Sequence, residues 1–159
     1  MSQHDPLAKL SELGLTLPDD PGASANYIPF KAIGETLYLS GQGPRASDGT
    51  WILGTIGGDV TVAEAYGHAR TVGLQLLAVA SKAAGGLHLL EVVKVFGMVN
   101  AVAGFADHPK VINGCSDLFV DVLGERGRHA RSAVGMGSLP NRMTVEIEAI
   151  MRILPEEEC

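Results

Sequence analysis

A nearly continuous apolar run, VVKVFGMVN at residues 92–100, constrains the fold of this chain more than any other feature. Such a run is typical of a strand whose two faces are both covered, since a strand with one solvated face alternates apolar and polar residues. Apolar residues recur every three or four positions from 65 to 83 before the run and from 111 to 122 after it, which is the pattern of an amphipathic helix. The sequence therefore predicts a central strand covered by two long helices.

Both helical patterns carry end signals. Thr61 and Glu64 have the spacing of a capping box, and Gly85 can end that first helix. Asp107 is a candidate cap for the second helix, with Pro109 at its first helical position.

Five further segments are predicted to be strands, at 27–33, 36–40, 51–53, 131–136 and 143–154. Gly34 and Glu35 separate the first two, which favours a hairpin closed by a type II′ turn. The last segment places Glu146 and Glu148 on one face and apolar residues on the other. With a short helix expected at 5–14, the order of elements predicts an α+β fold, a mixed β-sheet with its helices on one face.

The length of 159 residues favours one domain. Residues 1–22 are interpreted as an N-terminal helix and a linker, because prolines and a glycine within 18–22 exclude regular structure there. Residues 23–154 are the single predicted domain, and 155–159 are a C-terminal tail.

The composition limits the compartment and the assembly. Hydrophobic residues make up 46% of the chain and charged residues 19%, which excludes a disordered protein and is charge-poor for a small monomer, so a buried interface between copies is expected. No apolar run reaches the roughly 18 residues of a membrane helix, and the N-terminus lacks a signal-peptide pattern. Cys115 and Cys159 do not make a disulfide framework, which favours the cytoplasm.

The same inventory excludes several kinds of chemistry. The net charge of −6 argues against general nucleic-acid binding. The histidines show no metal-ligand spacing, and the common nucleotide-binding, redox and hydrolase motifs are absent. Neither a metal nor a cofactor is therefore predicted. Cys115 lies on an apolar helix face and is interpreted as a small buried hydrophobe.

Charged residues in the C-terminal half are the candidates for a site. Arg131 opens a strand, and Glu146 and Glu148 share one face of the last strand. Charges on a covered face need a partner, because an unpaired buried charge is expensive. The spacing alone favours a solvated face or a structural Arg–Glu pair over a site.

Motifs at these residues carry a family resemblance. The segments are HARSAV at 129–134, SLP at 138–140, VEIEA at 145–149, SGQGP at 40–44, and Asn113 on the second helix. Together they resemble the signature of the RidA/YjgF family, which has S-G-Q-x-P, A-R-S-x-V, L-P and [VI]-E-[IV]-E-A in this order along the chain. The N-terminal helix and residues 109–114 look like the longer-chain branch, often labelled endoribonuclease L-PSP or translation inhibitor.

The resemblance implies a chorismate-mutase-like fold and a homotrimer whose sheets meet in a central β-barrel, with sites in the clefts between subunits. It also implies cofactor-free hydrolysis of reactive 2-imino or 2-enamino acids to 2-keto acids and ammonia. The expected partners are a small carboxylate substrate and two further copies of the chain, with no membrane or nucleic acid.

Family roles carry over to matched residues. The resemblance implies that Arg131 holds the substrate carboxylate with the backbone N–H of Ala133, and that Glu146 activates the water. Gly41 would let the backbone approach the substrate closely, and Tyr27 would close the pocket.

Three further positions complete the comparison with the family. Asn113 would position a loop or a water, and His129 either lines the site or is a loop histidine. Ala133 replaces a cysteine of the principal deaminase branch, and Gly135 and Gly137 replace bulkier residues, which is expected to enlarge the cleft.

Two alternatives to a deaminase stay open. One is a non-catalytic binder that senses keto or amino acids with Arg131 but needs no water-activating Glu146. The other is an endoribonuclease using a local patch at Arg126, Arg128 and His129, against which the net charge of −6 speaks.

Overall fold

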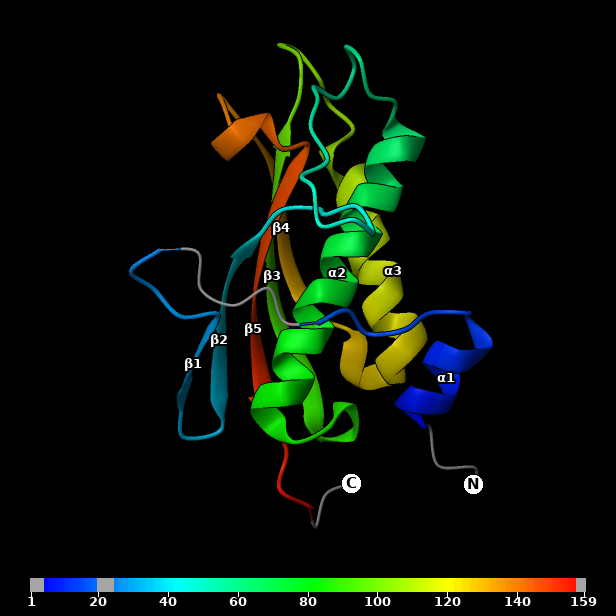
Figure 1. Ribbon diagram of the computed structural model, residues 1–159, viewed down its shortest axis with the longest axis vertical. Coiled ribbons are helices and arrows are strands. Elements are labelled where there is room, and N and C mark those ends of the chain that lie inside the picture. The colour runs from blue at the N-terminus through cyan, green and yellow to red at the C-terminus, as the bar shows by residue number, and fades with distance from the viewer. Residues whose placement is uncertain (1–4, 20–24, 157–159) are drawn as a thin grey trace.

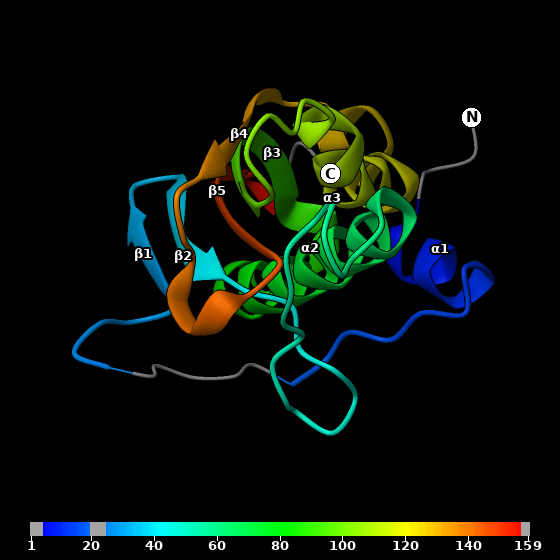
Figure 2. The ribbon, with the colours of Figure 1, turned by 90° about the horizontal axis from the view of Figure 1, so that it is seen from above.

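The computed structural model describes residues 5–19 and 25–156, and in them one five-stranded sheet is covered on one face by two long helices (Figures 1 and 2). The elements are α1 (Pro6–Glu12), β1 (Phe30–Ile33), β2 (Thr36–Gln42), α2 (Val62–Ala84), β3 (Leu90–Asn100), α3 (His108–Leu123), β4 (Ala130–Met136) and β5 (Val145–Ile153). Short 3₁₀ turns lie at Leu87–Leu89, Gly124–Gly127 and Pro140–Arg142. The predicted α+β class with helices on one face is confirmed.

The strands follow the order β1-β2-β5-β3-β4. Among the five described strands only β3 and β4 pair in parallel, with α3 as the crossover between them, and the other strand pairs are antiparallel. The predicted hairpin closes through Gly34 at φ 59°, while Glu35 keeps a negative φ, the combination that a type II′ turn requires.

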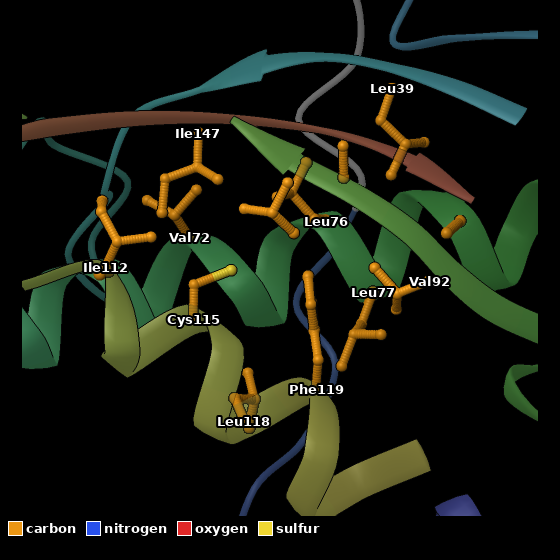
Figure 3. Close-up of a cluster of buried hydrophobic side chains, with 14 of the residues drawn as sticks. Leu39, Val72, Leu76, Leu77, Val92, Ile112, Cys115, Leu118, Phe119 and Ile147 are labelled. Carbon is orange, nitrogen blue, oxygen red and sulfur yellow. The ribbon is translucent and has the colours of Figure 1, made fainter. Parts of the chain in front are cut away.

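The core lies between the helices and the covered face of the sheet (Figure 3). Leu76 and Leu77 of α2, Ile112 and Phe119 of α3 and Ile147 of β5 are fully buried there. Leu10 of α1 belongs to the same core, because α1 packs against α3. The N-terminal helix therefore shares the hydrophobic core of the main sheet.

The ends of α2 follow the sequence signals, whereas the start of α3 departs from them in two ways. Thr61 and Glu64 form the reciprocal capping box, and Gly85 ends α2 in the left-handed conformation at φ 89°. Asp107 holds the cap position of α3, but its carboxylate pairs with Lys110 at 3.0 Å and accepts no helix N–H. Pro109 is the second residue of that helix, one position later than expected.

Two strand predictions were wrong. Residues 51–53 form no strand, because Trp51 and Leu53 make only isolated bridges, to Arg45 and Met143, and the Trp51 ring stacks on the Arg45 guanidinium at 3.7 Å. The first strand begins at Phe30 and leaves Tyr27 in the preceding bend.

The other face of the sheet is open, so the expected cover on both faces of β3 is absent within the described chain. Tyr38 and Val134 on that face are 45% and 38% exposed. Phe96 and Met98 of β3 stand there half-buried by their neighbours alone, since α2 and α3 both lie on the opposite face (Figure 2). The predicted linker at 17–22 and tail at 155–159 extend outside the described residues at 20–22 and 157–159.

Candidate functional site

Arg131 lies near the start of β4 and reaches across to α3. Its partner in the sheet register is Val95, which is fully buried against the helices, so Arg131 points to the helix side. Its Nη1 donates to Asn113 Oδ1 at 2.9 Å and to Ser116 Oγ at 3.1 Å. The structure thus brings together Arg131 and Asn113, two of the predicted site residues, and adds Ser116.

His129 belongs to the same cluster. Its Nε2 lies 2.9 Å from Ser116 Oγ, and its Nδ1 lies 2.6 Å from the Gly127 carbonyl oxygen. Burial lowers the pKa of His129, and the Arg131 charge lowers it further against the opposing effect of the Gly127 carbonyl, so the ring is neutral at pH 7. His129 thus lies in the loop just before β4, and its ring and Arg131 both bond Ser116.

The guanidinium of Arg131 keeps one edge free. Both hydrogens of Nη1 are used by Asn113 and Ser116. Among the described residues nothing accepts from its Nε or Nη2, and no carboxylate pairs with it. This excludes the structural Arg–Glu pair within the described chain and leaves the Nε–Nη2 edge able to hold a carboxylate with two parallel hydrogen bonds.

Glu146 lies on β5 at the opposite, open face of the sheet. Burial raises the pKa of its carboxyl, and the neighbouring Glu148 raises it further. Glu146 is half-buried, whereas Glu148 is exposed. A carboxylate whose pKa is raised toward neutrality is suited to exchange a proton with a water.

Gly41 makes room for the Glu146 carboxylate. It lies in the irregular stretch of the β2–β5 register between Leu39 and Gln42, and a Cβ added at Gly41 would be 2.5 Å from Glu146 Oε1. The buried Gln75 of α2 braces this segment, because its amide donates to Gln42 Oε1 at 3.1 Å and to the Gly43 carbonyl at 2.9 Å.

Tyr27 stands near this second group of residues. It is 49% exposed and lines a hollow of about 320 Å³ together with Tyr38 and Ser40. Ser40 precedes Gly41, and its hydroxyl donates to the Ile28 carbonyl at 2.7 Å, which fastens the chain next to Tyr27.

The predicted site residues therefore fall into two half-sites on opposite faces of the sheet. Arg131 shares a row of the register with Val95 and Ala149, on the helix side. Glu146 shares a row with Met98, on the open side. Because side chains alternate along a strand, one chain does not join Arg131 and Glu146 into one pocket.

The two glycines after Ala133 differ from each other in the space around them. Ala133 packs against the core, and its backbone follows Arg131 along β4. The space over Gly135 is not empty, since a Cβ there would be 2.6 Å from His108 Nε2. Gly135 therefore accommodates the His108 ring and does not enlarge a cleft, whereas a Cβ at Gly137 would meet nothing within 4 Å.

The remaining candidates are structural. Cys115 is fully buried as predicted, and burial raises the pKa of its thiol, so it is not a nucleophile. In the described ranges no three His, Cys, Asp or Glu side chains are grouped as metal ligands would be. No described helix has the length and apolar character needed to cross a membrane.

Comparison with known proteins identifies the family. A model of the family described as "YjgF/chorismate mutase-like, putative endoribonuclease" matches residues 7–146, which include Arg131, Asn113, Gly41 and Glu146. The chain belongs to this family. The YjgF/RidA resemblance and the chorismate-mutase-like fold expected from the motifs are thereby confirmed.

Three solved structures are similar to the chain over most of its length. Atu1372 of Agrobacterium tumefaciens, a protein of unknown function, is 44% identical, with a TM-score of 0.84 and 93% of each chain covered. A "putative endoribonuclease" of Shewanella oneidensis is 30% identical, with a TM-score of 0.89, covering 94% of this chain and 99% of its own. RidA of Psychrobacter is 28% identical, with a TM-score of 0.59, covering 87% of this chain and 98% of its own.

Ser116 and Gln75 were missed by the sequence analysis. Ser116 stands three positions after Asn113 and so lies on the same side of α3, but no motif marks it. Gln75 is a polar residue inside the apolar pattern of α2, which was the signal available in the sequence, and the structure buries it to 5% exposure.

Proposed function

We propose that this protein is a hydrolytic deaminase that converts reactive 2-imino or 2-enamino acids to 2-keto acids and ammonia. The observation that carries the proposal is the free Nε–Nη2 edge of a guanidinium whose other nitrogen is held by Asn113 and Ser116. Membership of the YjgF/RidA family supports the same activity.

Arg131 supplies binding and orientation. The carboxylate shared by all 2-imino acids accepts two parallel hydrogen bonds from the free edge, which fixes both position and direction. The backbone N–H of Ala133 is the proposed second donor, since it follows Arg131 along the edge strand β4.

Glu146 supplies the proton transfers. In the proposed reaction Glu146 takes a proton from water as the oxygen bonds to the imine carbon, and it returns this proton to the imine nitrogen, giving a neutral tetrahedral aminoalcohol. Glu146 then moves the hydroxyl proton to the amino nitrogen, so that the C–N bond breaks as the carbonyl forms, ammonia leaves, and one water is consumed for each keto acid formed. The raised pKa of Glu146 suits it to accept and return this proton.

Completion of the site requires a second copy of the chain. Arg131 and Glu146 face opposite sides of one sheet, so the proposed site joins the Arg131 half of one copy to the Glu146 half of the next. The exposed Tyr38 and Val134 on the open face supply apolar surface for such contacts. We propose a homotrimer, in which cyclic symmetry repeats the interface between the Arg131 half-site of one copy and the Glu146 half-site of the next.

The decisive test is keto-acid release from 2-iminopropanoate generated freshly by an amino-acid oxidase. The proposal expects pyruvate to form faster with the protein than in buffer, and expects the increase to be lost in Glu146→Gln. A rate equal to that in buffer, from protein that still binds 2-ketobutyrate, would instead establish the non-catalytic binder.

The endoribonuclease alternative finds little support at its predicted patch. Arg126 donates to the His88 carbonyl at 2.7 Å, and Arg128 pairs with Glu125 at 3.3 Å. His129 is held by Ser116 and Gly127, so the three side chains do not form a phosphate-binding surface with a free acid–base pair.

A further inference from the structure

A chain of hydrogen bonds extends from the carboxylate-binding arginine into the protein. It passes from Arg131 Nη1 to Ser116 Oγ at 3.1 Å, from Ser116 to His129 Nε2 at 2.9 Å, and from His129 Nδ1 to the Gly127 carbonyl oxygen at 2.6 Å. The three side chains come from α3, from β4 and from the residue just before β4.

The two ends of this chain fix the direction of every hydrogen within it. A guanidinium only donates, and a carbonyl oxygen only accepts. His129 must therefore carry its hydrogen on Nδ1, which leaves Nε2 as the acceptor of the Ser116 hydroxyl hydrogen. Ser116 Oγ then keeps a lone pair for Arg131, so each group has one role that its neighbour requires.

Packing holds the far end of the chain in place. The His129 ring stands edge-on to Phe119 at 5.8 Å between centroids, and Phe119 is fully buried. Backbone and core atoms thus set the position of the imidazole, and the imidazole sets the Ser116 hydroxyl.

We propose that Ser116 and His129 are positioning residues for Arg131, which hold its guanidinium so that the Nε–Nη2 edge faces the carboxylate of the bound 2-keto or 2-imino acid. This inference rests on the proposed function for the identity of the ligand. Without Ser116, Nη1 keeps only its hydrogen bond to Asn113, and the guanidinium can rotate about that bond. Ordering the guanidinium when the ligand binds then costs binding free energy.

The test uses calorimetric titration of 2-ketobutyrate into two matched pairs of full-length variants. Ser116→Ala removes the hydroxyl and Ser116→Thr keeps it. His129→Phe keeps a ring against Phe119 but removes the acceptor, and His129→Gln places an amide oxygen near the position of Nε2. Thr71→Ala is the control, because within residues 5–19 and 25–156 that hydroxyl of α2 bonds only the Gly67 carbonyl, at 3.1 Å.

The expected result is a loss of about tenfold in affinity in Ser116→Ala and in His129→Phe. The affinities of Ser116→Thr, His129→Gln and Thr71→Ala should stay within about twofold of wild type. Equal affinities across each matched pair would overturn the proposal, and so would a Ser116→Ala variant that binds as tightly as wild type.

A second measurement separates this inference from the proposed function. Nitrogen-15 NMR spectra of the wild type should show the Nδ1–H tautomer of His129 and Arg131 Nη1 protons that exchange slowly with water. In Ser116→Ala and His129→Phe this exchange should become fast. If these signatures are present but wild type does not bind 2-ketobutyrate, the positioning role stands and the carboxylate site fails. If wild type binds but His129 carries its hydrogen on Nε2, the positioning role fails and the site stands.

Discussion

Substitution of Gly41 by alanine should lower turnover strongly without unfolding the protein. A Cβ at this position would be 2.5 Å from Glu146 Oε1 and 3.4 Å from Glu146 Cδ and Cγ. Ordinary contact begins near 3.4 Å, so the carboxylate oxygen has to retreat by the difference of about 0.9 Å. That movement falls on the atom proposed to take the proton from water.

A misplacement of about 1 Å in a reacting group can lower a rate by roughly 100-fold, and we expect Gly41→Ala to lower kcat by about that factor. KM should change little, because Arg131 on the other half-site is untouched. The free energy of unfolding should change by less than about 1 kcal/mol, since Gly41 has no positive φ and the displaced atom ends a flexible side chain.

The assay is pyruvate release from freshly generated 2-iminopropanoate, with thermal unfolding measured on the same preparations. Gly67→Ala on α2 is the matched control, because a Cβ there meets nothing within 4 Å. A Gly41→Ala variant with wild-type kcat would refute the placement of Glu146 as the base. Loss of kcat together with the fold would show that Gly41 serves the β2–β5 pairing instead.

Three further predictions concern the two half-sites and the helix pair. Because the folded-state pKa of Glu146 is raised, its carboxyl stabilises the fold at low pH and this contribution is lost as pH rises through that pKa. Glu146→Gln should therefore raise the unfolding temperature at pH 7 while abolishing turnover. Glu148→Gln removes the charge that raises the pKa of Glu146, so the acid limb of the pH–rate profile should shift to lower pH in a stopped-flow titration. Arg131→Ala should weaken calorimetric binding of 2-ketobutyrate by roughly 2–5 kcal/mol with the oligomer mass unchanged, and Arg131→Lys should recover only part of it; wild-type affinity in Arg131→Ala would remove the carboxylate clamp. Gly114→Ala would drive a methyl group into the Tyr66 backbone carbonyl where α3 packs on α2, and should lower stability in urea unfolding by about 1–3 kcal/mol, an effect that an unchanged midpoint would exclude.

The helices and the last strand could be predicted because their signals are local. The capping box forms at Thr61 and Glu64, and Gly85 ends the helix, both as predicted. Each signal depends on residues within one turn of the helix. The alternation along β5 likewise placed Glu146 on the face opposite the core. Residues 51–53 misled because a short apolar run between turns becomes a strand only where a neighbour pairs with it.

The separation of Arg131 from Glu146 was outside the reach of local patterns. It depends on the register in which β4 and β5 both pair with β3, and those pairings join residues far apart in the sequence. The motifs named both residues but carried no information on which face each occupies. His108 over Gly135 and Ser116 beside Arg131 arise in the same way, from the packing of α3 on β4.

We expect an intact site to take Arg131 from one copy of the chain and Glu146 from another. Co-expression of Arg131→Ala with Glu146→Gln, each inactive alone, tests this claim by pyruvate release from 2-iminopropanoate. Random assembly of the two variants should restore about a quarter of wild-type turnover, because about one interface in four then combines an intact arginine with an intact glutamate. A purified mixed oligomer no more active than either variant alone would contradict the claim.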